Sequence, residues 1–187
     1  MGRRPQPQIA ADLLDACTDV ALAHGLPDRL DPFVAGTGVS ARMLLYHFGT
    51  RDDLRRAVLR RARERQRAFY GGLLQVRADE PYPVTLRRAW TEMTGERGRP
   101  FLAVFGRLRE DAEQQLWPGF RREATTDWLA PLEVGLASVG AAHGATLALA
   151  VIRGLIIDLE STGDRERVDA AFDRFVLILP VGAAAPA

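Results

Sequence analysis

The residues best suited to chemistry lie in one short stretch of the chain, residues 40–51, which combines hydroxyl groups, two guanidinium groups, a thioether and aromatic rings. The guanidinium of Arg42 is a planar fork that can donate two hydrogen bonds to the edge of a guanine base. Met43 or Ala41 can contact the methyl group of thymine. The other groups in the stretch that are suited to phosphate oxygens are Tyr46, His47 and Arg51.

Two helices joined by a tight turn are needed to present these groups, and the neighbouring residues predict both. Leu30, Phe33 and Val34 recur at three- and four-residue intervals, which is typical of one buried face of a helix. Gly38 then suits a left-handed helix end, so the turn falls at residues 37–39.

Ser40 has the hydroxyl of a helix N-cap, and the prediction is a second helix over residues 41–47. Its inward face would consist of Leu44, Leu45 and Phe48. Thr50 is a further cap, with Asp53 three residues later as in a capping box, and Asp52 and Asp53 suit a helix N-terminus. A third helix is therefore expected from about Arg51 to about Val76.

The segment from Thr37 to Leu54, T-G-V-S-A-R-M-L-L-Y-H-F-G-T-R-D-D-L, resembles the recognition segment of the TetR family of transcriptional repressors. That segment reads roughly A-G-V-S, three variable residues, L-Y-x-H-F, a short cap, then K-E and L. The upstream run IAADLLDACTDVALAHG, closed by Gly25, fits the first helix of the family. The match covers residues 8–55, which is under a third of the chain.

The chain departs from the family pattern at four positions. Leu45 replaces a tyrosine, Arg29 stands where a capping threonine is usual, and Pro32 and Gly36 are unusual inside a helix. The resemblance implies that double-stranded DNA is contacted by a set of eight residues: Arg29, Ser40, Ala41, Arg42, Met43, Tyr46, His47 and Arg51.

Beyond the motif, the spacing of apolar residues and breakers predicts only helices, over residues 84–94, 101–115, 120–139, 145–161 and 165–179. Together with the family resemblance, this gives an all-α fold of about nine helices. The expected domains are a three-helix DNA-binding domain at residues 8–55 and a ligand-binding and dimerisation domain at residues 56–180.

Large apolar residues in the second domain could line a ligand cavity, since helical modules bind small molecules between helices in mostly apolar pockets. The simpler interpretation is that most of them form the core. The family resemblance implies a pocket, and the candidate lining residues are Trp90, Met93, Phe101, Phe105, Trp117, Phe120 and Trp128.

The last two predicted helices each carry a continuous apolar stripe, and in the resembling family the corresponding helices form a four-helix dimer interface. A two-fold protein also suits a DNA reader that spans two half-sites. The alternative is a hairpin that only closes the core of one chain. The predicted interface residues are Leu147, Val151, Leu155, Leu159, Val168, Phe172, Phe175 and Leu179.

Charge is unevenly distributed, although the net charge is only +1. Residues 1–78 contain 13 arginines and 8 acidic residues, whereas residues 79–187 contain 12 arginines and 16 acidic residues. The basic half contains the motif, as phosphate binding requires. Seven arginines between Arg55 and Arg67 could equally be a solvated helix face.

Catalysis and export are not indicated. The three histidines are far apart, no HExxH, CxxC, GxSxG or P-loop pattern occurs, and we expect no catalytic site, metal or cofactor. A single cysteine, Cys17, and an N-terminus without an apolar signal segment indicate the cytoplasm. The run GATLALAVIRGLIIDL contains Arg153 and Asp158, so we expect a buried helix and no membrane association.

The sequence therefore predicts a dimeric, ligand-responsive transcriptional regulator. We expect it to repress by binding a palindromic operator and to be released by a small apolar effector. The alternative is a helical small-molecule-binding protein without a DNA function. The two interpretations differ in the outward face of the helix at residues 41–47, which has no reason to combine these side chains if it only packs.

Overall fold

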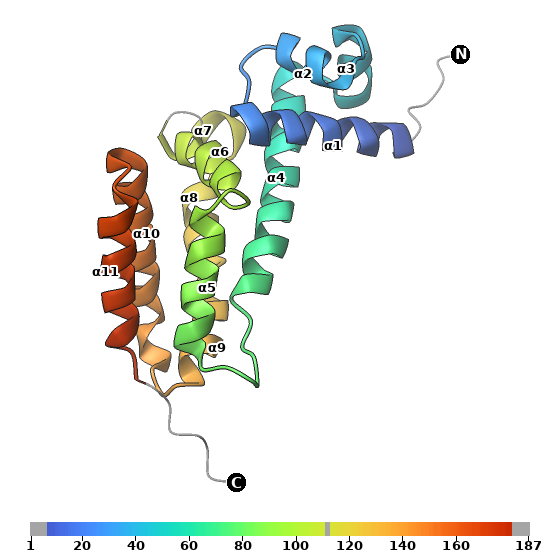
Figure 1. Ribbon diagram of the computed structural model, residues 1–187. Coiled ribbons are helices and arrows are strands. Elements are labelled where there is room, and N and C mark those ends of the chain that lie inside the picture. The colour runs from blue at the N-terminus through green and yellow to red at the C-terminus, as the bar shows by residue number, and fades with distance from the viewer. Residues whose placement is uncertain (1–6, 111–112, 181–187) are drawn as a thin grey trace. The chain divides into compact units, whose positions relative to one another are not determined.

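The computed structural model describes residues 7–110 and 113–180, and every regular element in these ranges is helical (Figure 1). The expected all-α fold is confirmed. The chain forms two compact units, each assembled from separate segments. The first unit comprises residues 1–67 and 98–121, and the second comprises residues 68–97 and 122–187.

The first unit contains the predicted helix-turn-helix and a second segment from later in the chain. Its elements are α1 (Pro7–His24), α2 (Asp31–Thr37), α3 (Ala41–Phe48), most of α4 (Arg51–Leu73), α6 (Arg99–Glu110), α7 (Glu113–Leu116) and the first residues of α8 (Phe120–Thr126). The segment predicted as one helix over residues 101–115 includes residues 111 and 112, which lie outside the described residues.

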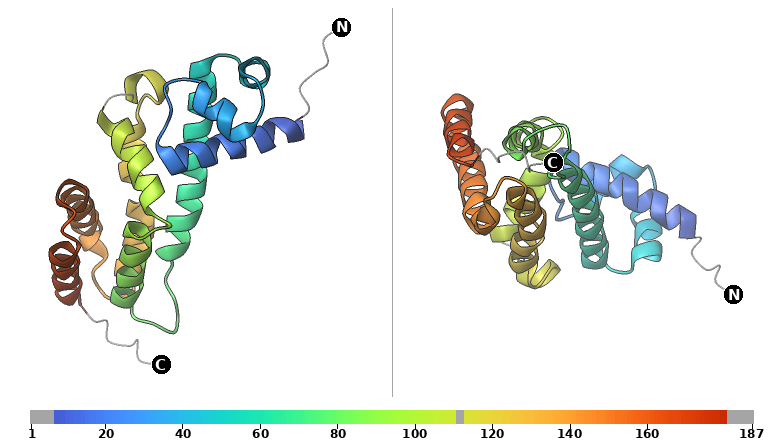
Figure 2. Two further views of the ribbon diagram at one scale, coloured as in Figure 1. Left: turned by 45° about the horizontal axis from the view of Figure 1, so that its top comes forward. Right: turned by 90° about the horizontal axis from the view of Figure 1, so that it is seen from below.

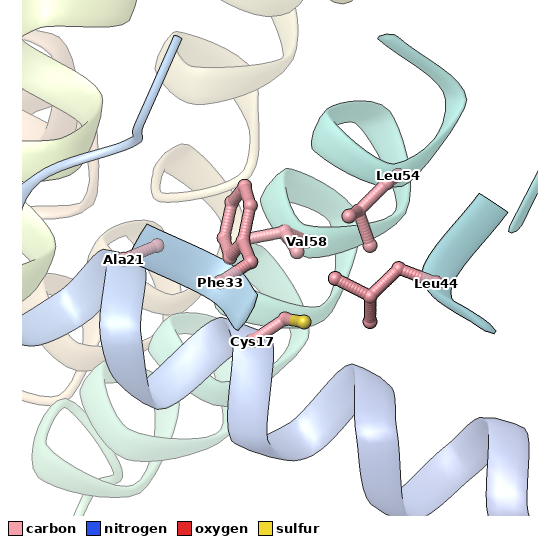
Figure 3. Close-up of a cluster of buried hydrophobic side chains, with 6 residues drawn as sticks. All are labelled: Cys17, Ala21, Phe33, Leu44, Leu54 and Val58. Atoms are coloured by element: carbon pink, nitrogen blue, oxygen red, sulfur yellow. The ribbon is translucent and has the colours of Figure 1, made fainter. Parts of the chain in front are cut away.

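One apolar cluster joins the first four helices of the first unit (Figure 3). Every member is fully buried, which removes apolar surface from water on all four helices at once. Its members are Cys17 and Ala21 from α1, Phe33 from α2, Leu44 from α3, and Leu54 and Val58 from α4. This cluster fixes α3 against its neighbours and leaves the opposite side of that helix uncovered.

The second unit contains the ends of α4 and α8 together with α5 (Tyr82–Thr94), α9 (Leu129–Ala137), a short 3-10 helix (Ala142–Gly144), α10 (Ala145–Thr162) and α11 (Arg165–Leu177). Helices α10 and α11 lie side by side as an antiparallel hairpin (Figure 2). Gly163 closes α10 in the left-handed conformation, at φ 68°.

Residues 120–139 form two helices, so the prediction of one continuous helix there is wrong. The helix is interrupted at Asp127 and Trp128, between α8 and α9. Pro131 accounts for the interruption, because a proline ring clashes with the carbonyl four residues earlier, which here belongs to Asp127.

Helix α10 is more exposed than expected. The helical stretch Ala142–Thr162 is long and apolar enough to cross a membrane by length and composition alone, and 28% of its apolar 18-residue part is buried within the chain. The expectation of a buried helix is therefore wrong for the single chain. Buried residues such as Ala148, Ile152 and Ile156 cover one side, while Leu147 is 61% exposed and Ile157 is 52% exposed.

The predicted apolar stripe on α11 faces the chain's own core. Val168, Phe172 and Phe175 are 0%, 1% and 7% exposed. Phe172 stacks on Trp90 of α5 with ring centroids 4.5 Å apart. These three side chains therefore pack within their own chain, as they would in the alternative hairpin interpretation. Of the other predicted interface residues, Val151, Leu155, Leu159 and Leu179 are partly buried.

Candidate DNA-binding site

The turn between α2 and α3 has the predicted local structure. Gly38 adopts φ 70°, and its N–H donates to the carbonyl oxygen of Val34 at 2.9 Å, which ends α2. Ser40 is the N-cap of α3, and its side-chain oxygen accepts a hydrogen bond from the backbone N–H of Met43 at 3.3 Å. The predicted helix over residues 41–47 is found as Ala41–Phe48.

Gly36, unusual in the family pattern, has a packing role. A Cβ atom at this position would lie 2.2 Å from Cγ2 of Val20 on α1, far inside van der Waals contact. Glycine therefore permits the close approach of α2 to α1. Pro32 lies in the first turn of α2, where the missing N–H of proline has no intrahelical acceptor to lose.

The outward face of α3 is formed by Arg42, Met43 and Tyr46, which we call the reading face. Arg42 is exposed, Met43 is 45% exposed and Tyr46 is 48% exposed, whereas Leu44 is fully buried. Leu45 was expected to point inward, but it is 36% exposed. The reading face therefore presents two large apolar side chains and an arginine together on one exposed side of α3.

The N-terminus of α4 is closed by a reciprocal cap between Thr50 and Asp53, as predicted. The hydroxyl of Thr50 donates to Asp53 Oδ2 at 2.6 Å and accepts the N–H of Asp53 at 3.1 Å, and the N–H of Thr50 also donates to Asp53 Oδ2. The hydrogen bond from the Thr50 side chain is the main cause that lowers the pKa of the Asp53 carboxyl. This cap fixes the segment that follows the reading face.

Some members of the predicted DNA-binding set already have partners. Arg51 donates from Nε to Asp52 at 3.1 Å, which lowers the pKa of that carboxyl, and Arg29 pairs with Asp31 at 3.2 Å. His47 is half-buried, and its Nδ1 atom is buried without a hydrogen-bond partner among the described residues. Ala41 is partly buried and Ser40 is exposed.

The arginines on α4 between Arg55 and Arg67 include three that form ion pairs with other parts of the first unit. Arg61 and Arg65 bind Asp15 of α1 at 2.7 and 2.9 Å, and Arg65 also binds Asp19 at 2.6 Å. Arg55 reaches Asp28, before α2, at 2.6 Å. The solvated-face interpretation therefore fails for these arginines, and their charge is largely neutralised within the chain. These ion pairs could not be predicted from the sequence, because the acidic partners lie far from the arginines along the chain.

The seven candidate ligand-lining residues do not lie in one unit. Phe101, Phe105, Trp117 and Phe120 belong to the first unit, while Trp90, Met93 and Trp128 belong to the second. All but Trp117 and Trp128 are buried. The Nε1 atom of Trp90 donates to Asp169 of α11 at 2.7 Å, in addition to the stacking on Phe172.

Two polar residues that the sequence analysis did not identify lie within the aromatic cluster of the first unit. Phe105 and Phe120 stack with centroids 5.3 Å apart, and the guanidinium carbon of Arg63 lies 5.8 and 5.7 Å from their centroids. Arg63 donates to Gln66, and both residues are about 95% buried, at 5% and 4% exposure. Their spacing from the buried Leu59 and Tyr70, at three- and four-residue intervals, was the available signal.

No protein-family model matches the chain, and no curated protein matches its sequence. Its fold is similar to that of a transcriptional regulator from Rhodococcus sp. Rha1, with a TM-score of 0.71 and 22% sequence identity over 91% of this chain and 95% of that one. It is also similar to the multidrug binding protein EbrR, solved in complex with imidazole, with a TM-score of 0.63 and 23% identity over 98% of this chain and 96% of that one. At these identities the likeness establishes the fold, which this chain shares with a transcriptional regulator along nearly its whole length.

Proposed function

We propose that the chain is a DNA-binding transcriptional regulator of the TetR type and that α3 is its recognition helix. The observation that carries the proposal is the reading face, because Arg42, Met43 and Tyr46 are exposed on a helix whose opposite side is fixed in the core. A helix held in this way can enter the major groove without moving. The fold shared with a transcriptional regulator supports the proposal.

Each group on this face has a distinct role in the proposal. Arg42 donates a bidentate pair to guanine, and Met43, with Ala41 beside it, contacts a thymine methyl group. Tyr46 and Ser40 contact phosphate, and Arg51 does so beside the N-terminus of α4. Arg29 and His47 have minor roles, because Arg29 lies before α2, outside the recognition helix, and His47 is half-buried.

The internal ion pairs of α4 predict an unusual balance of binding energies. Arg55, Arg61 and Arg65 are engaged by acidic side chains and release few counterions when the protein meets DNA. Non-specific binding is therefore weak for so arginine-rich a domain, and a large share of operator affinity comes from the reading face. The slope of log affinity against log salt is accordingly shallow.

A two-fold dimer completes the proposal, because two reading faces must engage two half-sites whose centres lie about 34 Å, or a multiple of that distance, apart. The exposed apolar side of α10 supports dimerisation through the α10–α11 hairpin. We place the protein in the cytoplasm, where its DNA is, and assign it no enzymatic activity.

The proposal includes regulation by a small molecule, supported by the fold shared with the multidrug binding protein EbrR. The cluster of Phe105, Phe120 and Trp117 around the buried Arg63–Gln66 pair is the best candidate for effector contact, because it combines aromatic surface with buried polar groups. Trp90 is already fixed by Asp169 and Phe172, so its proposed role is to support α11. Occupancy would weaken operator binding by a typical coupling of about 1–3 kcal/mol, and the regulator would then act as a repressor.

The test is fluorescence anisotropy on an operator duplex and on a scrambled duplex with Arg42→Ala, using Arg60→Ala as a matched loss of an exposed arginine on α4. Arg42→Ala is expected to lose about 1–3 kcal/mol on the operator only. Arg60→Ala is expected to change both duplexes alike. A chain that binds no duplex but binds small molecules would support the alternative of a ligand-binding protein without a DNA function.

A further inference from the structure

Three side chains in the described parts of the chain contain sulfur, and they differ in exposure. Met43 on the reading face is 45% exposed, whereas Cys17 on α1 and Met93 on α5 are 0% and 5% exposed. Met1 lies outside the described residues. An oxidant dissolved in water therefore has access to one of these three sulfur atoms, and that atom lies on the proposed DNA-binding surface.

Cys17 has the more easily oxidised type of side chain, but its position protects it. A peroxide attacks the thiolate form of cysteine, and burial raises the pKa of Cys17 to about 11. At neutral pH the thiol is therefore protonated as well as fully buried. Among the described residues of the first unit, oxidation at sulfur is thus directed to Met43.

The backbone at Met43 is fixed, so a change at its sulfur alters the surface of α3 and not its fold. The N–H of Met43 donates to the N-cap Ser40 at 3.3 Å, and Leu44, the next residue, is fully buried. On a helix with 3.6 residues per turn, Tyr46 lies between Arg42 and Met43 within an arc of about 100°. The thioether therefore lies beside the groups that we assign to base and phosphate contacts.

Oxidation of an exposed methionine by a peroxide is a two-electron reaction. One oxygen atom is transferred to the sulfur, so that a sulfur–oxygen bond forms, the oxygen–oxygen bond of hydrogen peroxide breaks, and the other oxygen leaves as water. The sulfur is oxidised to the sulfoxide, and the peroxide is reduced. The product replaces a flexible apolar side chain with a polar one.

The sulfoxide is a poor partner for the base contact proposed for Met43. The methyl group of thymine offers no hydrogen-bond donor, so the sulfoxide oxygen would lose its bound water at the DNA interface without gaining a partner. A desolvated polar group without a partner is costly. The proposed phosphate contacts of Tyr46, Ser40 and Arg51 do not involve the sulfur, so the cost falls on sequence-specific binding.

We propose that Met43 is an oxidative modification site, at which hydrogen peroxide lowers the affinity of the reading face for its operator. The inference rests on the proposed function, because it requires α3 to be the recognition helix. Methionine sulfoxide reductases convert the product back to the thioether, so the modification is reversible. It acts on the reading face directly and does not require an effector.

Fluorescence anisotropy of the full-length chain, before and after treatment with hydrogen peroxide, tests the proposal on an operator duplex selected by the untreated chain. Mass spectrometry of the tryptic peptide 43–51, which contains no other sulfur, measures the conversion of Met43. We expect affinity for the operator to fall about tenfold or more and affinity for a scrambled duplex to stay the same. Methionine sulfoxide reductases of both stereospecificities should restore operator affinity.

Two matched variants separate Met43 from the other oxidisable groups. Met43→Leu keeps an apolar side chain of similar size but has no sulfur, and its operator affinity should be the same before and after peroxide treatment. Met93→Leu removes the buried thioether instead and should respond to peroxide as the wild-type chain does. A fall in the operator affinity of Met43→Leu as large as that of the wild-type chain would assign the response to another residue and overturn the proposal.

Protection by DNA gives a second measurement that does not depend on affinity after oxidation. Because a methionine against a base is shielded from water, saturating operator should slow the conversion of Met43, measured on the same peptide. An equal rate of conversion with and without operator would show that Met43 lies outside the DNA interface and would overturn the proposal.

Two further results would contradict the proposal. A chain that retains its operator affinity with Met43 fully oxidised would make Met43 a surface methionine without a regulatory role. Equal losses of affinity on the operator and the scrambled duplex would indicate general damage. Selection of DNA sequences by the untreated chain is measured separately: a chain that selects an operator but does not respond to oxidation supports the proposed function and overturns this inference alone, whereas a chain that selects no sequence overturns both.

Discussion

Replacement of Gly36 by alanine should destabilise the protein although it removes a glycine from a helix. The new Cβ would lie 2.2 Å from Val20 Cγ2, whereas carbon atoms in contact are ordinarily about 3.5–4.0 Å apart, so α2 or the Val20 side chain must move by more than about 1 Å. Overpacking of this kind typically costs about 1–3 kcal/mol. The gain in helix propensity returns about 0.5–1 kcal/mol.

The net expectation for Gly36→Ala is a loss of up to about 2.5 kcal/mol, centred near 1 kcal/mol, in the free energy of unfolding, and each 1 kcal/mol lost lowers Tm by about 2–4 °C for a protein of this size. Urea titration and calorimetry measure both quantities. In a Val20→Ala background the same substitution should cost at least about 1 kcal/mol less, because the clashing methyl group is gone. The control is Gly71→Ala in α4, where a Cβ meets nothing within 4 Å and a small stabilisation is expected. If Gly36→Ala stabilises as Gly71→Ala does, the close approach of α1 and α2 is not a constraint and the reasoning is refuted.

Three other predictions concern single side chains. Burial raises the pKa of Tyr82 to about 12. The free energy of unfolding should therefore fall as pH rises from about 10 to about 12, because the phenol loses its proton at lower pH in the unfolded chain than in the folded chain. Thermal unfolding of Tyr82→Phe should lack this pH dependence. The hydroxyl of Thr50 lowers the pKa of Asp53, so Thr50→Val should raise that pKa in an NMR titration. The cap stabilises the fold above the ordinary carboxyl pKa of 3.8, and this contribution is lost as pH falls through the lowered pKa; it should be smaller in Thr50→Val. An unchanged Asp53 pKa would contradict the cap. Asp52→Asn should release Arg51, strengthen binding to all duplex DNA alike and make the affinity for DNA depend more steeply on salt. A gain in affinity confined to one sequence would argue against a phosphate role for Arg51.

Local signals in the sequence were sufficient to predict the turn and the helix caps on either side of α3. Ser40, Gly38 and the Thr50–Asp53 pair act through hydrogen bonds that span at most four residues, so their partners could be read from spacing alone. Leu45 was placed inward incorrectly because it follows Leu44 directly, and successive residues of a helix are turned by about 100° around its axis, so Leu45 faces away from the cluster that buries Leu44.

Long-range partners were not predictable. The interpretation of the arginines on α4 depended on Asp15 and Asp28, which lie 46 and 27 positions away from Arg61 and Arg55. The stripe on α11 was recognised as apolar, but periodicity cannot tell a face that meets another chain from one that meets α5. The exposed apolar side of α10 became visible only once the structure had placed Ala148, Ile152 and Ile156 in the core.

The most direct test of the central claim is selection of bound sequences from a library of random duplex DNA by the wild-type chain. The account predicts an enriched palindrome whose half-sites lie about one helical turn or a multiple apart, each with a guanine that loses its enrichment when Arg42→Ala is used. Recovery of sequences without a shared motif, or a motif unchanged in Arg42→Ala, would contradict the assignment of α3 as the recognition helix.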